Sequence, residues 1–110
     1  MNNWTKWKPM PSPENARTID GPEGPGVYQI WNKKTKQFIQ FGIGSDCRYR
    51  MKSFFPKHYG VGTRNNEAKR QYILDNWKQL EYRTIETESR EDAKRIEDNL
   101  KSDNNHLFNT

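Results

Sequence analysis

The segment GVYQIWNKKTKQFIQFGI (residues 26–43) decides the fold. Two of its runs, GVYQIW and QFIQFGI, are rich in aromatic and β-branched residues, and the polar NKKTK separates them. Such runs joined by a short polar stretch predict an antiparallel β-hairpin. With the loop centred near Lys34, Tyr28 and Gln40 are predicted to be cross-strand neighbours on one face.

The chain beyond this hairpin alternates between helix and strand patterns. SDCRYRMKSF (45–54) predicts a helix with Ser45 or Asp46 as its N-cap. Apolar residues at helical spacing predict a second helix over residues 66–80. LEYRTIET (80–87) predicts a third strand, and SREDAKRIEDNLK (89–101) a helix opened by Ser89. The order predicts an α+β fold in which a small three-stranded antiparallel sheet is flanked by helices.

The first 25 residues contain five of the six prolines and show no helical or strand period. We therefore predict an extended N-terminal arm over residues 1–20 and a folded domain over residues 21–110. Trp4 and Trp7 of the arm would either pack across the domain or contact a partner, and packing is the commoner fate of tryptophan.

Length and charge limit the function classes. A chain of 110 residues has room for one domain with a modest core. The net charge is +5, but residues 33–70 contain ten Lys or Arg against two acids, a local charge of +8. Such a surface suits a polyanion such as nucleic acid. The charges alone are equally well explained as ordinary solubilising residues.

Several classes of protein are disfavoured. A single cysteine, Cys47, excludes an internal disulfide and a cysteine-based zinc site, and it is expected to be a small buried hydrophobe. The N-terminus lacks the apolar core of a signal peptide, and no apolar run approaches the length of a membrane span. We therefore expect a cytoplasmic protein that does not contact membranes.

One carboxylate lies at an unexpected position in the predicted last helix. Ala93, Ile96 and Leu100 form its apolar stripe, and Glu97 completes that stripe. A carboxylate there needs an arginine, a hydrogen-bond network or a metal ion. It could also be a boundary glutamate whose stem covers the core while its head reaches water.

These features together resemble the GIY-YIG nuclease family. GPEGPGVYQI is similar to that family's opening, with Gly26, Val27 and Tyr28 at the GIY positions. Eleven residues separate Tyr28 from QFG (residues 40–42), which stands where the family has YIG. The resemblance covers residues 21–110.

The later family residues also have counterparts. The family's arginine lies eight positions beyond the YIG glycine, which here is Arg50. Its glutamate lies on a later helix in a context like AKRIEDNLK, which makes Glu97 the match. The closing HLFNT is similar to the family's terminal segment. The departure is Gln40, which replaces the second tyrosine of the signature.

The resemblance implies a metal-dependent endonuclease that hydrolyses phosphodiester bonds. It assigns one Mg²⁺ (or Mn²⁺) to Glu97, the role of base to Tyr28, and stabilisation of phosphate charge to Arg50. A glutamine can orient water or donate to a phosphate oxygen but cannot act as a base, so Gln40 is expected to position the attacking water.

The expected ligand is nucleic acid, DNA rather than RNA, with a protein partner as a source of specificity. The predicted nucleic-acid contacts are Arg48, Tyr49, Lys52, His58 and Arg64. The main alternative is a catalytically impaired nucleic-acid-binding module of the same fold, in which Tyr28 is a core aromatic. A protein-interaction domain that uses the tryptophan-containing arm is a third class.

Overall fold

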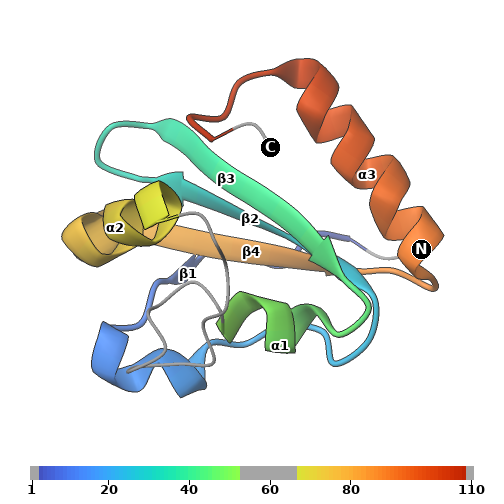
Figure 1. Cartoon of the computed structure of the whole chain (residues 1–110), viewed down its shortest axis with the longest axis horizontal. Helices are drawn as coiled ribbons and strands as arrows, with labels where there is room; N and C mark the ends of the chain where they lie inside the picture. Colours follow the sequence, from blue (N-terminus) through green and yellow to red (C-terminus); the bar gives the residue numbers. More distant parts are fainter. Residues whose placement is uncertain (1–2, 53–66, 109–110) are drawn as a thin grey trace.

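The computed structural model describes residues 3–52 and 67–108. Its elements in chain order are β1 (Lys8–Pro9), η1 (Pro13–Thr18), β2 (Gly26–Asn32), β3 (Gln37–Gly44), α1 (Cys47–Met51), α2 (Glu67–Asn76), η3 (Trp77–Gln79), β4 (Leu80–Glu86) and α3 (Arg90–Asp103). The four strands form one antiparallel sheet in the order β1-β4-β2-β3 (Figure 1). The α+β class predicted from the sequence is confirmed. Within the described ranges, no helix has the length and apolar character needed to cross a membrane.

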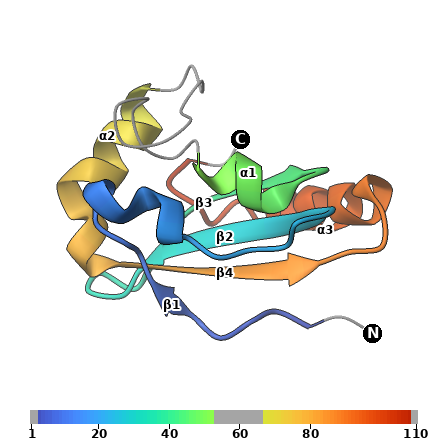
Figure 2. The ribbon, with the colours of Figure 1, turned by 90° about the horizontal axis from the view of Figure 1, so that it is seen from below.

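The sheet separates two apolar clusters. Tyr28 and Ile30 of β2 face one cluster, together with Met51 of α1 and Ile73 of α2. Val27, the residue between the GIY glycine and tyrosine positions, faces the other cluster with Ala93 of α3. Figure 1 shows α1 and α3 on opposite sides of the strands, and Figure 2 shows the sheet from below. Adjacent residues of β2 therefore pack on opposite faces of the sheet.

The hairpin forms as predicted, but with a shifted register. Tyr28 pairs with Gly42, and Gln40 pairs with Ile30. The loop moves the register by one residue from the predicted centre, and a β-bulge opposite Ile30 moves it by a second, because Ile39 is an extra residue in β3. Tyr28 and Gln40 thus share a face, as predicted, but they are diagonal rather than directly opposite.

The predicted helices form, and one of them ends earlier than predicted. Asp46 is the N-cap of α1 and accepts a hydrogen bond from Tyr49 N at 3.0 Å. Ser89 caps α3 and accepts from Asp92 N at 3.1 Å, as predicted. The helix predicted to reach residue 80 ends at Asn76 and continues as the short η3. Leu80 begins β4 instead, because its backbone pairs with β2.

The N-terminal arm supplies a fourth strand, so the prediction of a three-stranded sheet was one strand short. Lys8 of β1 pairs with Tyr82 of β4. On either side, Thr5 N donates to Thr84 O at 2.8 Å and Met10 N donates to Leu80 O at 3.0 Å. A two-residue edge strand that ends in proline has too little pattern to be recognised in a sequence.

The arm is also part of the core. Met10, Ala16 and Ile19 are buried in the cluster that contains Tyr28. The described part of the predicted arm, residues 3–20, thus contributes core side chains and a strand to the folded unit.

Both arm tryptophans pack against one arginine of β4. The Arg83 guanidinium carbon lies 4.5 Å from the ring centre of Trp4 and 4.6 Å from that of Trp7. Its Nε donates to Gln29 Oε1 at 2.8 Å. Desolvation lowers the pKa of Arg83 from its ordinary value, and the two rings offer the charge a cation–π environment instead of water. Cation–π contacts of Arg83 with Trp4 and Trp7 therefore help to hold the arm on the sheet.

Arg83→Met is expected to destabilise the domain by about 2 kcal/mol, because Gln29 Oε1 becomes a buried acceptor without a donor and both cation–π contacts are lost. Urea denaturation measures this change. Arg95→Met is the matched control, since Arg95 is an exposed α3 residue that pairs with Asp92 of its own helix, and its loss should cost less than about 0.5 kcal/mol. Equal effects of the two substitutions would contradict the fastening role of Arg83.

The segment after α3 covers part of the outer edge of β3. Leu107 N donates to Phe38 O at 3.0 Å, and Phe108 N donates to Ile39 O at 2.8 Å. These consecutive carbonyls lie at the β-bulge. The segment that follows α3 thus pairs with β3 at its bulge. This part of the β3 edge is therefore not open for pairing with another chain.

Candidate functional site

The two glycines of β3 organise the candidate site. A Cβ on Gly42 would lie 2.6 Å from Cζ of Tyr28, so the phenol ring crosses the strand where a side chain is missing. A Cβ on Gly44 would lie 3.1 Å from Cβ of Arg50. Neither glycine has a positive φ. Close approach of Tyr28, rather than backbone geometry, therefore requires glycine at position 42, and Arg50 leaves little room for a side chain at position 44.

Tyr28 and Gln40 lie in the interior. Their side chains share the sheet face that carries the larger apolar cluster, and they are 0% and 1% exposed. Oε1 of Gln40 has no hydrogen-bond partner within the described ranges. The structure thus places Tyr28 and Gln40 on one face, as predicted, but beneath the surface and with Gly42 opposite Tyr28.

Glu97 lies on α3, in the layer opposite the apolar cluster that contains Tyr28. α3 packs on β3 and β2, and its apolar residues contact the cluster around Val27. The Glu97 side chain is only 15% exposed, and its Oε1 accepts a hydrogen bond from Lys94 Nζ at 3.0 Å. The prediction that this carboxylate lies at the edge of a buried stripe is confirmed. Its pairing with Lys94, one turn earlier on α3, was not predicted.

The residues around Glu97 can be compared with the needs of a metal ion. Within residues 3–52 and 67–108, no three His, Cys, Asp or Glu side chains gather as a ready set of ligands. Magnesium commonly binds through one or two carboxylates and keeps water and substrate oxygens as its other ligands. Glu97 fits this mode through Oε2, although Lys94 competes for the same carboxylate.

Three of the predicted nucleic-acid contacts gather beside α1. Arg48, Tyr49 and Lys52 line an open pocket of about 370 Å³, together with Glu23 and Asp46. Arg48 Nη1 lies 3.3 Å from Glu23 Oε1. The other two predicted contacts, His58 and Arg64, lie outside the described residues. The basic helix thus also carries acidic neighbours that the charge count along the sequence did not place there.

Cys47 is buried, as predicted. Burial raises the pKa of its thiol to about 12, and its Sγ lies 3.9 Å from Sδ of Met51. A thiol with so high a pKa is protonated at neutral pH and is a poor nucleophile. Cys47 therefore belongs to the core and not to the site.

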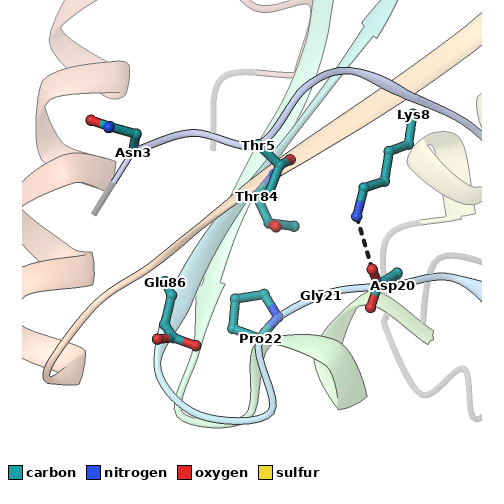
Figure 3. Close-up of a pocket in the computed structure, with 8 residues that line it drawn as sticks. All are labelled: Asn3, Thr5, Lys8, Asp20, Gly21, Pro22, Thr84 and Glu86. Atoms are coloured by element: carbon teal, nitrogen blue, oxygen red, sulfur yellow. Dashed lines mark hydrogen bonds and ion pairs between the residues drawn. The ribbon is translucent and has the colours of Figure 1, made fainter. Parts of the chain in front are cut away.

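A second pocket, of about 420 Å³, lies between the arm and β4 and was not predicted. Figure 3 shows Thr5 and Thr84 between Asn3 on one side and the ion pair of Lys8 and Asp20 on the other, where Nζ and Oδ2 are 2.8 Å apart. The hydrogen bond from Lys8 lowers the pKa of the Asp20 carboxyl. Because Lys8 belongs to the arm, this pocket exists only while the arm is in place.

A network of hydrogen-bonded, buried polar side chains on the α3 side of the sheet was also not predicted. Arg83 Nε donates to Gln29 Oε1, so the Gln29 amide nitrogen faces His106 Nε2 at 3.1 Å. His106 must accept there and carries its proton on Nδ1. That nitrogen is buried and has no partner among the residues that the structure describes. The local signal that could have indicated it is Gln29 itself, a polar residue within the apolar run GVYQIW.

Comparison with models of known protein families and with curated proteins finds no match to this sequence.

Proposed function

We propose that this domain is a metal-dependent endonuclease of the GIY-YIG type, which hydrolyses phosphodiester bonds of DNA rather than RNA. The observation that carries the proposal is the glycine edge of β3. Tyr28 crosses Gly42 and Arg50 lies against Gly44, while α3, with the largely covered carboxylate of Glu97, packs on the same strand from the opposite layer of the sheet. These are the residues that the resemblance singles out.

The proposed roles follow from the chemistry of each side chain. Arg50 stabilises the negative charge that develops on the phosphate during attack by water. Tyr28 removes a proton from that water, which requires a phenol pKa below its ordinary value of about 10. Gln40 orients the water through its amide and leaves the proton transfer to Tyr28.

The metal requirement rests on Glu97. Its Oε2 would hold a magnesium or manganese ion, and a bound ion would supply positive charge at the scissile phosphate. Lys94 must release Oε1 or share the carboxylate, so we expect metal binding to be weaker than at a site with several carboxylates. A protein partner that positions the DNA would supply the specificity that a single domain of this size lacks.

A second candidate function is favoured by a specific observation. Tyr28 and Gln40 are almost completely buried, so neither reaches a substrate unless the core on that face opens. A nucleic-acid-binding module that has kept the fold without the chemistry has no such requirement. In that case Tyr28 is a core aromatic, and the basic residues beside α1 account for the function.

The two candidates are separated by one cleavage experiment. Supercoiled plasmid and a set of branched and flapped DNAs are incubated with the protein in Mg²⁺, Mn²⁺ or EDTA. Metal-dependent nicking that falls to background in Glu97→Gln supports the nuclease. The control is Glu91→Gln, an exposed carboxylate on the same helix, which should leave the rate unchanged. Binding without cleavage would contradict the nuclease and support the binding module.

A further inference from the structure

Tyr49 is placed unusually for an aromatic residue of this protein. It is 60% exposed, although its position on α1 is fixed by the hydrogen bond from its own N–H to the Asp46 carboxylate. Tyrosine rings ordinarily gain stability by burying their faces. An exposed ring on a capped helix beside basic residues is suited to stack on a nucleobase.

The charges around this ring indicate which part of a nucleic acid the pocket accepts. Glu23 and Asp46 contribute two negative charges to its lining, and Arg48 and Lys52 contribute two positive charges. A phosphate inside the pocket would therefore meet two carboxylates and gain no net attraction. A neutral base is suited to this setting, because carboxylate oxygens accept hydrogen bonds from base amino groups.

The size of the pocket agrees with a single base. Its volume of about 370 Å³ lies at the small end of the range for ligand pockets. A base inside a duplex has both faces covered by its neighbours, so it reaches a tyrosine ring only after it leaves the stack. Unpaired nucleotides require the least energy for this step.

We propose that the pocket formed by Glu23, Asp46, Arg48, Tyr49 and Lys52 binds one unpaired nucleobase. The preferred substrate is then DNA with an extrahelical nucleotide, with the base stacked on Tyr49 and the flanking phosphates on the basic residues at the rim. This inference rests on the proposed function only in that nucleic acid must bind beside α1; it does not require cleavage.

Binding in EDTA tests the inference independently of catalysis. Fluorescence anisotropy compares a perfect duplex, the same duplex with one extrahelical cytosine, and a third duplex with an extrahelical abasic site at that position. The protein is expected to bind the cytosine duplex about tenfold more tightly than the other two. Tyr49→Ala should remove that preference, and Tyr49→Phe, which keeps the ring, should retain it.

The variants have separate readouts. Tyr49→Ala should weaken binding of the cytosine duplex more than binding of the perfect duplex, because stacking needs an unpaired base whereas phosphate contacts do not. Glu23→Gln should reduce the preference for cytosine over the abasic site, since the amide group is a weaker acceptor than the carboxylate. Equal affinity of the wild-type protein for cytosine and abasic duplexes, or for bulged and perfect duplexes, would overturn the inference.

Failure of the proposed nuclease is recognised separately. A protein that prefers the extrahelical cytosine through Tyr49 but never cleaves it supports the base pocket and contradicts the endonuclease. A protein that cleaves with dependence on Glu97 but shows no Tyr49-dependent preference supports the endonuclease and contradicts the base pocket. Absence of DNA binding at moderate salt overturns the base pocket, while cleavage is judged by its own assay.

Discussion

Replacement of Gly42 by alanine is expected to destabilise the domain by about 3 kcal/mol. The new methyl group would lie 2.6 Å from Cζ and 2.7 Å from Cε2 of Tyr28. Neither side can yield easily, because the ring is fully buried and the backbone of Gly42 is paired with that of Tyr28. Urea denaturation should show the loss as a lower midpoint with an unchanged slope.

Gly24→Ala is the control for this substitution. A Cβ at Gly24 would have no atom within 4 Å, so the change should stay within about 0.5 kcal/mol of wild type. A second test places Gly42→Ala in a Tyr28→Leu background, where the clashing ring atoms are missing. The cost should then fall below about 1 kcal/mol, which is the coupling expected of two groups that compete for one space. An equal cost in both backgrounds would show that Tyr28 is not the obstacle.

Acidification below pH 6.5 is expected to destabilise the domain through His106. Burial lowers the pKa of this histidine to about 4, and the charge of Asp103 opposes that shift in part. Protonation would also place an N–H on Nε2 of His106, so that two donors face each other, because the Gln29 amide is held in its orientation by Arg83. The histidine therefore stays neutral in the folded protein at pH values where it is charged in the unfolded chain.

The sign of the pH dependence follows from the number of bound protons. Between pH 6.5 and about 4 the unfolded chain binds more protons at His106 than the folded protein does, so the free energy of unfolding falls as the pH falls. The contribution is complete above pH 6.5, is lost progressively down to about pH 4, and reaches at most about 3 kcal/mol. Below that pH this residue adds no further change.

Denaturation of a His58→Gln variant across this range isolates the effect, because His106 is then the only histidine. Adding His106→Phe should flatten the profile between pH 6.5 and 4, even though the loss of the acceptor for Gln29 lowers stability at every pH. An NMR titration of His106 should give a midpoint near pH 4. A midpoint near 6.5 would refute the argument from the buried polar network.

The elements with local signals were predictable from the sequence. The hairpin has two β-rich runs around a polar loop, and Ser89 stands three residues before Asp92, whose backbone N–H it accepts. The inward position of Glu97 followed from helical spacing alone. These features depend on residues close together in the chain, and there local preference and tertiary structure agree.

The features that could not be predicted depend on contacts between distant residues. The register of Tyr28 was missed because the loop is one residue off its predicted centre and the bulge at Ile39 adds a second residue, and neither shift leaves a mark in the sequence pattern. The strand in the arm was missed because its partner, β4, lies more than 70 positions later. The roles of Gln29 and Arg83 emerge only when Trp4, Trp7 and His106 are brought around them. Each of these depends on tertiary contacts that no local window contains.

The pairing of the arm with β4 also affects how the protein is made. Thr5 and Thr84 are 79 positions apart in the chain, so the arm leaves the ribosome long before its partner strand exists. Until residues 80–86 emerge, Trp4, Trp7 and Met10 have no sheet to cover and remain apolar surface on a nascent chain. Closing so long a loop also makes folding slow relative to helical domains of similar size. Chaperone dependence during synthesis should therefore be greatest for this arm.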